Sequence, residues 1–157
     1  MKQRIRKIVI SMLVAVLVIS SVSVPTQAAA KKDYTNADLK LLTCIVHAEA
    51  GGESYKGKVG VANVVLNRVK SSRFPDSIKA VIYQKSQFSP ARSGSLKREL
   101  RKYANYSSSA QLQSKKAAKA ALAGKDVVGK RLFFTRYTKR LAKKHPNYMK
   151  IGNHIFY

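Results

Sequence analysis

The sequence predicts an α+β fold that is mainly helical, with a short β-rich part at the C-terminal end. Apolar residues recur at helical spacing in the first half of the mature chain, from about residue 36 to residue 70. An Ala-rich segment at residues 108–125 is typical of a further helix. Residues 131–137 and 148–157 are aromatic and β-branched, which favours short strands. Helices followed by a small β-rich part indicate one α+β domain.

The first thirty residues have the order of a secretory signal peptide. A basic head (MKQRIRK) precedes an apolar run (IVISMLVAVLVI) and a small-residue tail broken by Pro25. The apolar run is shorter than the roughly 20 residues of a membrane-spanning helix. The alternative to a cleaved signal peptide is an uncleaved N-terminal anchor. Ala28 to Ala30 supply the small residues that a signal peptidase requires. We therefore expect residues 1–30 to be a signal peptide and residues 31–157 to form one exported domain.

The chain is strongly basic, with 31 Lys and Arg residues against 7 Asp and Glu residues. Four of the basic residues and none of the acidic ones lie in the leader, so the exported part carries a formal charge of +20. Such a charge attracts polyanions, which outside the cytoplasm are cell-wall polymers, anionic lipid surfaces or released nucleic acid. The basic run at residues 139–150 lacks a known nucleic-acid recognition module, so we interpret it as solvated charge.

The first helix is expected at about residues 36–50. Thr35 or Asn36 can cap it, and Asp38 suits the positive end of the helix dipole. The Gly51-Gly52 pair ends it.

A second helix is expected from about Gly57 to Lys70. The segment is apolar on nearly all sides, which is typical of a buried helix. Its many valines also suit a strand, but the segment is long for a strand. Four apolar residues fit a helical face: Val59, Ala62, Leu66 and Val69.

Less regular segments follow. Residues 74–84 read as a helix with Pro and Asp in its first turn. Residues 85–95 are rich in Ser and are expected to form a loop, and residues 96–108 are weakly patterned. The Ala-rich helix after them closes at Gly124.

Two of the chain's three glutamates, Glu49 and Glu53, stand four positions apart on either side of Gly51-Gly52. Glu49 follows Leu42 by two helical turns, so it continues the apolar stripe of the first helix into its last turn. Apolar burial and the negative end of the helix dipole both predict a raised pKa for Glu49, which suits a general acid. The alternative is a glutamate whose charged end reaches solvent at the end of the helix.

Glu53 is expected to support the site rather than to catalyse. The glycine pair interrupts the helix, which leaves the Glu53 carboxylate to accept hydrogen bonds that hold the loop. Asp76, Glu99 and Asp126 lie at a helix start or in basic or loop surroundings, so none offers a convincing second catalytic carboxylate. Because glycosidases that use water usually need two carboxyl groups, a single acid indicates that the substrate supplies its own nucleophile.

Other kinds of reactive site are not indicated. Cys44 lies in an apolar stretch and is expected to be a buried packing thiol. The histidines His47, His145 and His154 lack metal-ligand spacing, and His47 is expected to be exposed. No Gly-rich phosphate loop or Ser nucleophile elbow occurs. We therefore expect no metal and no cofactor.

Three stretches of the chain stand out together: AEAGGESYKGKVGVANVVLNRV, FPDSIKAVIYQKSQF and the tail IGNHIFY. In sequence and in order they resemble the spore cortex-lytic cell wall hydrolases of the SleB/CwlJ type. The likeness spans about Asp38 to Tyr157. It implies a small lysozyme-like domain, secreted to the cell wall or spore envelope, that acts as a monomer on peptidoglycan glycan strands.

The resemblance also assigns roles to residues. It places the family's functional glutamate on Glu49 and the second glutamate of the motif on Glu53. It gives a supporting role to Asn67 and Arg68. Three residues are expected to border the glycan groove, with core packing as the alternative for the aromatic ones: Tyr83, Gln87 and Phe88.

Relatives of the SleB type look like lytic transglycosylases, which implies cleavage between MurNAc and GlcNAc to leave 1,6-anhydro-MurNAc ends. A hydrolytic muramidase and a non-catalytic, cationic wall-binding protein on the same fold are the alternatives. The positive charge adds anionic wall polymers as a second expected partner. The signal peptide argues against a nucleic-acid-binding protein, so no nucleic acid is expected.

Overall fold

The computed structural model describes residues 34–157, so the expected signal peptide at residues 1–30 lies outside the described residues. Within residues 34–157 no helix is long and apolar enough to cross a membrane. The elements run in the order α1 Asn36–Ala50, α2 Tyr55–Lys70, α3 Ile78–Tyr83, α4 Ser89–Ser93, α5 Ser95–Lys102, the 3-10 turn Tyr103–Asn105, α6 Ser109–Leu122, β1 Phe134–Arg136, α7 Lys139–Lys144, β2 Met149–Ile151 and β3 His154–Phe156.

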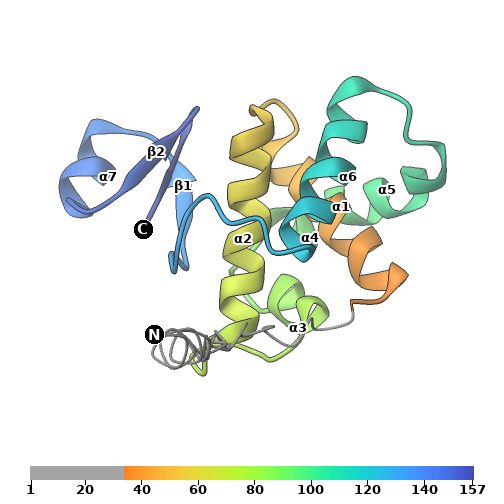
Figure 1. The fold of residues 1–157 in the computed structure, drawn as a ribbon, viewed down its shortest axis with the longest axis horizontal. Coiled ribbons are helices and arrows are strands. Elements are labelled where there is room, and N and C mark those ends of the chain that lie inside the picture. The colour runs from red at the N-terminus through yellow and green to blue at the C-terminus, as the bar shows by residue number, and fades with distance from the viewer. Residues whose placement is uncertain (1–33) are drawn as a thin grey trace, which may run out of the picture. The chain divides into compact units, whose positions relative to one another are not determined.

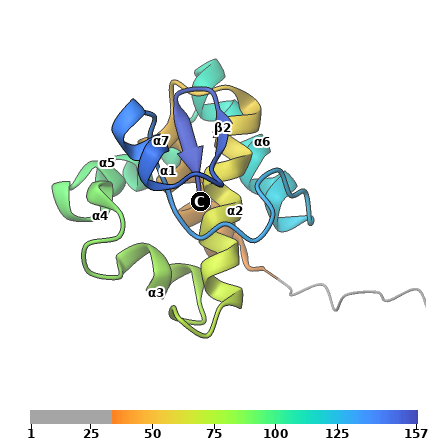
Figure 2. The ribbon, with the colours of Figure 1, turned by 90° about the vertical axis from the view of Figure 1, so that its left-hand side faces the viewer.

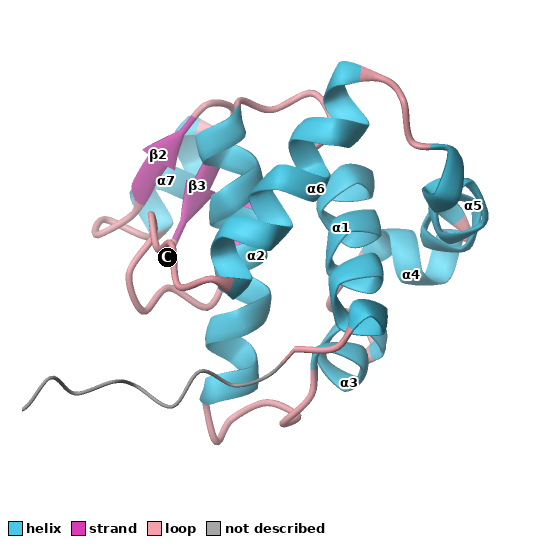
Figure 3. Ribbon diagram, turned by 45° about the vertical axis from the view of Figure 1, so that its right-hand side comes forward, coloured by secondary structure: helices cyan, strands magenta, loops and turns pink. Residues whose placement is uncertain are grey.

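Helix α2 is the centre of the described part. In Figure 1 it stands between the small sheet with α7 on one side and α1, α5 and α6 on the other. Figure 2 shows the sheet and α7 in front of α2, and Figure 3 shows strands only in this C-terminal part. The prediction of an α+β fold, mainly helical with a short β-rich end, is confirmed.

Helix α1 begins and ends where its sequence predicts. Thr35 and Asp38 form a capping box, since each side chain accepts a hydrogen bond from the other residue's backbone N–H at 3.1 Å. The apolar stripe is buried, with Leu42, Ile45 and Val46 each 0% exposed. The helix ends directly before the glycine pair, which gives the last turn of α1 a fixed place against the core.

Helix α2 is buried on nearly all sides, as its composition predicts, and it begins two residues earlier than expected. Ser54 caps it by accepting a hydrogen bond from the Gly57 N–H at 3.2 Å. At Gly60 the sheet comes very close, because a Cβ atom there would lie 2.8 Å from Cζ of Phe156. The missing side chain therefore sets how closely the sheet packs on α2.

The sheet has the strand order β1-β3-β2 with antiparallel pairing throughout. Phe156 in the central strand pairs with Phe134 on one side and Met149 on the other. Strands β2 and β3 join through the two-residue turn Gly152-Asn153, in which Gly152 has a φ of 59°. A positive φ at the first position of such a turn favours glycine.

Three short helices differ from the sequence-based expectations. Helix α3 starts after the expected Pro and Asp, because Ser77 is its cap and accepts from the Ala80 N–H. Helix α4 lies in the segment expected to be a loop, and α7 lies in the basic run, where Thr138 caps it. Each has six residues or fewer, which is too short for apolar periodicity to reveal.

Candidate active site

Glu49 lies in the last turn of α1, directly after the buried stripe of that helix. Its side chain is half-buried. The turn at residues 51–54 then leads into α2 and carries Glu53. The two glutamates therefore sit on either side of one tight connection between two core helices.

Glu53 is bound to the turn between β2 and β3. Its Oε2 atom accepts a hydrogen bond from the Asn153 backbone N–H at 3.0 Å, and its Oε1 atom accepts one from the Asn153 side-chain amide at 3.1 Å. A Cβ atom at Gly152 would collide with Oε2 of Glu53, so the glycine also makes room for this carboxylate. The hydrogen bonds expected for Glu53 are present, and they tie the helical part to the sheet.

A cavity of about 270 Å³, which we call the Glu49 cavity, opens where these parts meet. Its lining comes from the end of α1, the α1–α2 turn, the end of β1 and the β2–β3 hairpin. The lining residues are Glu49, Ala50, Gly52, Glu53, Arg136, Asn153 and His154.

Burial raises the pKa of Glu49 above its ordinary value, because the charged carboxylate loses hydration there. Among residues 34–157, no hydrogen-bond donor or cation pairs with the Glu49 carboxyl group to offset this cost. A carboxyl group in this setting keeps its proton to higher pH than an exposed one. Glu49 can therefore donate a proton at a pH where exposed glutamates are ionised.

The pKa of Glu53 shifts the other way. Its partial burial by itself raises the pKa, but the two hydrogen bonds from Asn153, the positive charge of Lys58 and that of His154 when it is protonated together outweigh this. The net pKa of Glu53 is lowered, so its carboxylate is ionised at neutral pH. The two carboxyl groups of the Glu49 cavity therefore differ in charge over a range of pH.

His154 places an unpaired nitrogen at this cavity. Its Nδ1 atom is buried and has no hydrogen-bond partner among the described residues. Burial lowers the pKa of His154, Glu53 opposes that change and Arg136 adds to it, which leaves the imidazole neutral at pH 7.

Lys58 fixes the turn between the two glutamates from inside. It is 2% exposed, and its Nζ atom donates to the backbone carbonyls of Gly51 at 3.0 Å and Glu53 at 2.7 Å. These carbonyls follow the end of α1 and cannot all be bonded within the helix.

No group of three or more His, Cys, Asp or Glu residues in the described range is placed to hold a metal ion.

The chain matches the cell wall hydrolase family over residues 52–157. The chain belongs to the cell wall hydrolase family. The match includes Glu53 and begins three residues after Glu49, so the position of Glu49 in the site comes from the structure described above.

Individual relatives and solved structures agree with this membership. The chain is 33% identical to a spore cortex-lytic enzyme of Bacillus cereus over 126 residues, which are 78% of this chain and 45% of that enzyme. It therefore spans about half the length of the curated relatives it matches. Its structure is similar to the catalytic domain of the Bacillus cereus SleB protein, with a TM-score of 0.64, 31% identity, and coverage of 80% of this chain and 92% of that one.

The structure of this chain is equally similar to a second solved structure. It is the catalytic domain of the germination-specific lytic transglycosylase SleB from Bacillus anthracis, with a TM-score of 0.64, 31% identity, and coverage of 80% of this chain and 97% of that one.

Asn67 and Arg68 lie at the far end of α2 from Glu53 and do not line the Glu49 cavity. Asn67 donates from its side-chain amide to the carbonyls of Gly129 and Arg131 at 2.6 and 2.9 Å, and Arg68 donates from Nε to the carbonyl of Leu132 at 2.7 Å. The guanidinium of Arg68 also lies over three rings, those of Phe74, Phe88 and Phe133. Both residues thus hold the segment that leads into β1. The last residue of β1, Arg136, lines the Glu49 cavity.

The three residues expected along a glycan groove lie in different surroundings. Tyr83 is 50% exposed at the end of α3, and Gln87 is half-buried in the next loop. Phe88 is 1% exposed and packs against Arg68 and Phe134. The core position corrects the expectation that Phe88 borders a groove, since a fully buried ring cannot touch a glycan strand.

Three polar residues of the Glu49 cavity were not picked out as site residues in the sequence: Arg136, Asn153 and His154. Asn153 and His154 belong to the tail IGNHIFY, whose likeness to the family is the one signal that points to them. Arg136 lies among many other basic residues, so its charge gives no signal of its own.

The expectation that His47 is exposed is wrong. Helices α5 and α6 pack over it, so its side chain is 19% exposed, with Nε2 3.8 Å from Oε2 of Glu99 and Nδ1 3.3 Å from Oγ of Ser114. The expectation for Cys44 is confirmed. It is 0% exposed, and burial raises the pKa of its thiol to about 11, which disfavours a nucleophilic thiolate.

Proposed function

We propose that this chain cleaves peptidoglycan glycan strands between MurNAc and GlcNAc as a lytic transglycosylase. The observation that carries the proposal is Glu49, a half-buried and unpaired carboxyl group with a raised pKa at a cavity. The likeness to a lytic transglycosylase catalytic domain at 31% identity supports the same reaction class.

In the proposed reaction, Glu49 donates its proton to the bridging oxygen while the bond from that oxygen to the MurNAc anomeric carbon breaks. Positive charge develops at the anomeric carbon. The Glu49 carboxylate then takes the proton of the sugar's own 6-hydroxyl group, and the 6-oxygen bonds to the anomeric carbon. The product has a 1,6-anhydro ring, no water is consumed, and Glu49 is protonated again.

The state of Glu53 supports this one-acid reaction over hydrolysis with two carboxylates. Both of its oxygens accept hydrogen bonds from Asn153, so its carboxylate is held by the hairpin instead of being free to attack a sugar or to activate water. We assign Glu53 a supporting role, in which it fixes the hairpin that brings Asn153 and His154 to the cavity.

The remaining roles are proposed on the same basis. Asn67 and Arg68 support the site through the segment before β1. Tyr83 and Gln87 contact the glycan strand outside the cavity, for which the exposure of Tyr83 leaves its ring available. The domain at residues 31–157 acts as a monomer after secretion to the cell wall or spore envelope. Peptidoglycan is its substrate, and anionic wall polymers are its second partner.

Digestion of purified peptidoglycan followed by mass spectrometry of the fragments tests the function. The wild-type chain should release fragments with anhydro-MurNAc ends. Glu49→Gln should lower the rate by about 10²- to 10⁴-fold, the usual contribution of a general acid, while its circular dichroism spectrum stays unchanged. Glu53→Gln should cause a smaller loss.

Two results would contradict the proposal. Fragments with reducing MurNAc ends would identify a hydrolytic muramidase. Absence of cleavage by the folded wild-type chain would leave the non-catalytic wall-binding protein as the interpretation.

A further inference from the structure

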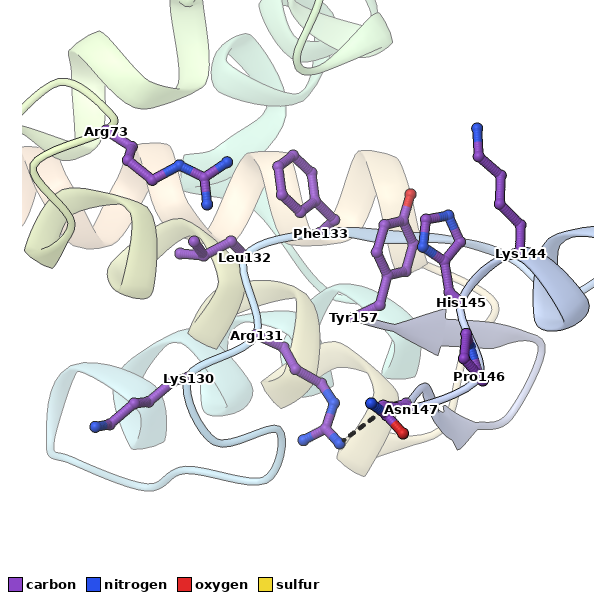
Figure 4. Close-up of a pocket in the computed structure, with 10 residues that line it drawn as sticks. All are labelled: Arg73, Lys130, Arg131, Leu132, Phe133, Lys144, His145, Pro146, Asn147 and Tyr157. Atoms are coloured by element: carbon purple, nitrogen blue, oxygen red, sulfur yellow. Dashed lines mark hydrogen bonds between the residues drawn. The ribbon is translucent and has the colours of Figure 1, made fainter.

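A second and larger cavity, of about 590 Å³, lies in the C-terminal part of the described chain. None of its lining residues belongs to the Glu49 cavity. Figure 4 shows the ten residues that form it: Arg73, Lys130, Arg131, Leu132, Phe133, Lys144, His145, Pro146, Asn147 and Tyr157.

The lining of this cavity is cationic. Four of the ten residues are Lys or Arg, and none is Asp or Glu. Arg131 is already bound, since it donates to the carbonyls of Val128 at 2.9 Å and Asn147 at 3.2 Å. Lys130 and Lys144 are exposed, and no acidic side chain among the described residues pairs with either of them. Their charge is therefore available to a ligand.

Three aromatic rings form one wall of the cavity. The ring of Tyr157 stacks on His145 with centroids 3.7 Å apart and on Phe133 with centroids 5.6 Å apart, each at an interplanar angle of 18°. Figure 4 shows the Tyr157 ring between the other two. Phe133 is in turn packed against Phe74 and lies under the buried guanidinium of Arg68, so the wall is anchored in the core.

The cationic lining continues into a neighbouring cavity of about 380 Å³, which shares Lys130 and Leu132 with the first. Its other lining residues are Asn67, Lys70 and Ser71, so it adds one more cation and no acidic residue. We call the two cavities together the cationic groove. Successive cations along a continuous lining suit a chain with repeated negative charges better than a single small anion.

We propose that the cationic groove binds a phosphodiester-linked polyol or sugar polymer of the cell wall, at a site separate from Glu49. The cations would contact the phosphodiester groups, and the edges of the stacked rings would contact the carbon-bearing units between them. The choice of a wall polymer rests on the proposed secretion to the wall, whereas the anionic chemistry rests on the groove alone.

The aromatic wall argues against nucleic acid in this groove. Single-stranded nucleic acid binds basic grooves by stacking its bases on open aromatic faces. The Tyr157 ring has His145 on one side and Phe133 on the other, so neither of its faces is open to a base.

Titration of the full chain with a glycerol phosphate oligomer of defined length tests the proposal. Lys130→Gln/Lys144→Gln should weaken binding by about tenfold and reduce its dependence on salt, because two phosphate contacts are lost. The matched control is Lys97→Gln/Lys102→Gln on α5, which removes the same charge from exposed residues that line neither cavity of the cationic groove. This control should bind within about twofold of the wild-type chain, as expected for distant surface charges.

Several results would overturn the proposal. Equal losses in the two variants would mean that net charge alone drives binding, and absence of binding by the wild-type chain would exclude the polymer. Binding of a thymidine oligomer as tight as that of the glycerol phosphate oligomer, and weakened in the same way by Lys130→Gln/Lys144→Gln, would assign the groove to nucleic acid.

This experiment distinguishes a failure of the cationic groove proposal from a failure of the proposed reaction at Glu49. Glu49→Gln should bind the glycerol phosphate oligomer like the wild-type chain, because the groove shares no residue with the Glu49 cavity. A chain that binds the oligomer but does not cleave peptidoglycan would leave the groove proposal intact and overturn the proposed reaction.

Discussion

Glu49 and Glu53 are four residues apart, yet their surroundings shift their pKa values in opposite directions. Burial without a partner raises the pKa of Glu49, whereas two hydrogen bonds from Asn153 lower the pKa of Glu53. When the surroundings of two nearby carboxyl groups shift their pKa values apart, the group with the raised pKa is the one suited to donate a proton. At the residue scale, the assignment of Glu49 as proton donor therefore depends on what each carboxyl group contacts.

The raised pKa of Glu49 predicts a pH dependence of stability. The pKa of this carboxyl group is higher in the folded chain than in the unfolded chain, where it is about 4.3. Its contribution to stability is therefore fully present at pH values below about 4.3. The contribution is lost as the pH rises through the pKa of the folded chain. Glu49→Gln cannot ionise, so it should be more stable than the wild-type chain at pH 7. The difference should shrink at pH 4, as measured by urea unfolding at both values.

The same group predicts the pH dependence of the proposed reaction. The rate constant kcat/KM should fall as pH rises through the pKa of Glu49, because the acid must be protonated to begin the reaction. A wild-type chain that is more stable than Glu49→Gln at pH 7, or a rate that rises throughout this range, would contradict the buried-acid interpretation.

The bond between Glu53 and Asn153 gives a second prediction at this scale. Asn153→Ala removes the side-chain hydrogen bond, and Glu53→Ala removes both bonds, so the second change should cost more stability. Each bond should contribute about 0.5–1.5 kcal/mol, near the low end because the pair is exposed. Urea unfolding of both variants and of the double variant gives the coupling energy, and a coupling near zero would mean that the pair does not hold the hairpin.

The stability that Glu53 contributes should also depend on pH. Its folded pKa is lowered, so the contribution is present above its ordinary value, about 4.3, and is lost as pH falls through the folded value. The destabilisation caused by Glu53→Ala should accordingly be larger at pH 7 than at pH 3.

At the scale of elements, the connection between α1 and α2 determines where both glutamates lie. Its backbone turns within four residues, and the carbonyls it exposes would be unsatisfied without Lys58. The buried ammonium group bonds two of them and lies at the negative end of the α1 dipole, where a cation is favourable. Burial lowers the pKa of Lys58 and Glu53 opposes that change.

Lys58→Met should therefore destabilise the fold by about 1–3 kcal/mol, the usual cost of leaving buried polar groups unpaired. The matched control is Lys56→Met, because Lys56 is exposed and two positions away on the same helix. Chemical unfolding of the two variants should give a large change for Lys58 and a change within about 0.5 kcal/mol for Lys56. Similar values for both would show that the carbonyl contacts contribute little.

A second group of contacts holds the N-terminal helices together. His47 of α1 lies against Glu99 of α5 and Ser114 of α6, and Tyr106 donates a hydrogen bond to Glu99 at 2.9 Å. Ser114 is 0% exposed and donates to the carbonyl of Ala110 within its own helix. A serine hydroxyl group beside a histidine, as in Ser114 and His47, is also the arrangement of a nucleophile with its base. The Ser114 hydroxyl group is buried and cannot reach a ligand, so here the arrangement is structural.

At the scale of the whole described chain, the Glu49 cavity exists because the sheet packs closely on α2. The close approach of Phe156 to Gly60 allows the hairpin to reach Glu53. Residues that line the cavity, such as Glu53 and Asn153, are about a hundred positions apart in the sequence, and this packing brings them together. Substitutions in the sheet should therefore change the surroundings of Glu49.

Gly60→Ala should destabilise the fold by about 1–3 kcal/mol, because the new methyl group would overlap the Phe156 ring. Gly52→Ala is the matched control, since nothing lies within 4 Å of a Cβ atom at that position. Thermal unfolding should separate the two variants clearly. An unchanged midpoint for Gly60→Ala would mean that the sheet can move away from α2 at little cost.

Sequence patterns predicted the long elements well and the short ones poorly. Helices α1, α2 and α6 have more than three turns, so apolar periodicity, together with a capping residue such as Thr35, specifies them locally. Helices α4 and α7 have six residues or fewer; α4 has no side-chain cap and one buried residue, and α7 has one side-chain cap and no buried residue. Their formation is decided by packing, which a local pattern does not contain.

The sequence by itself determined the fold class, the position of Glu49 at the end of a buried stripe, and the likeness to cell wall hydrolases. Each of these depends on residues that are close along the chain. The tertiary structure alone decided which residues join Glu49, because Arg136, Asn153 and His154 come from a distant sheet. It also placed Phe88 in the core and gathered the cationic groove. The physical reason is that burial, pKa and charge complementarity depend on contacts between distant residues, and these form only when the sheet packs on α2.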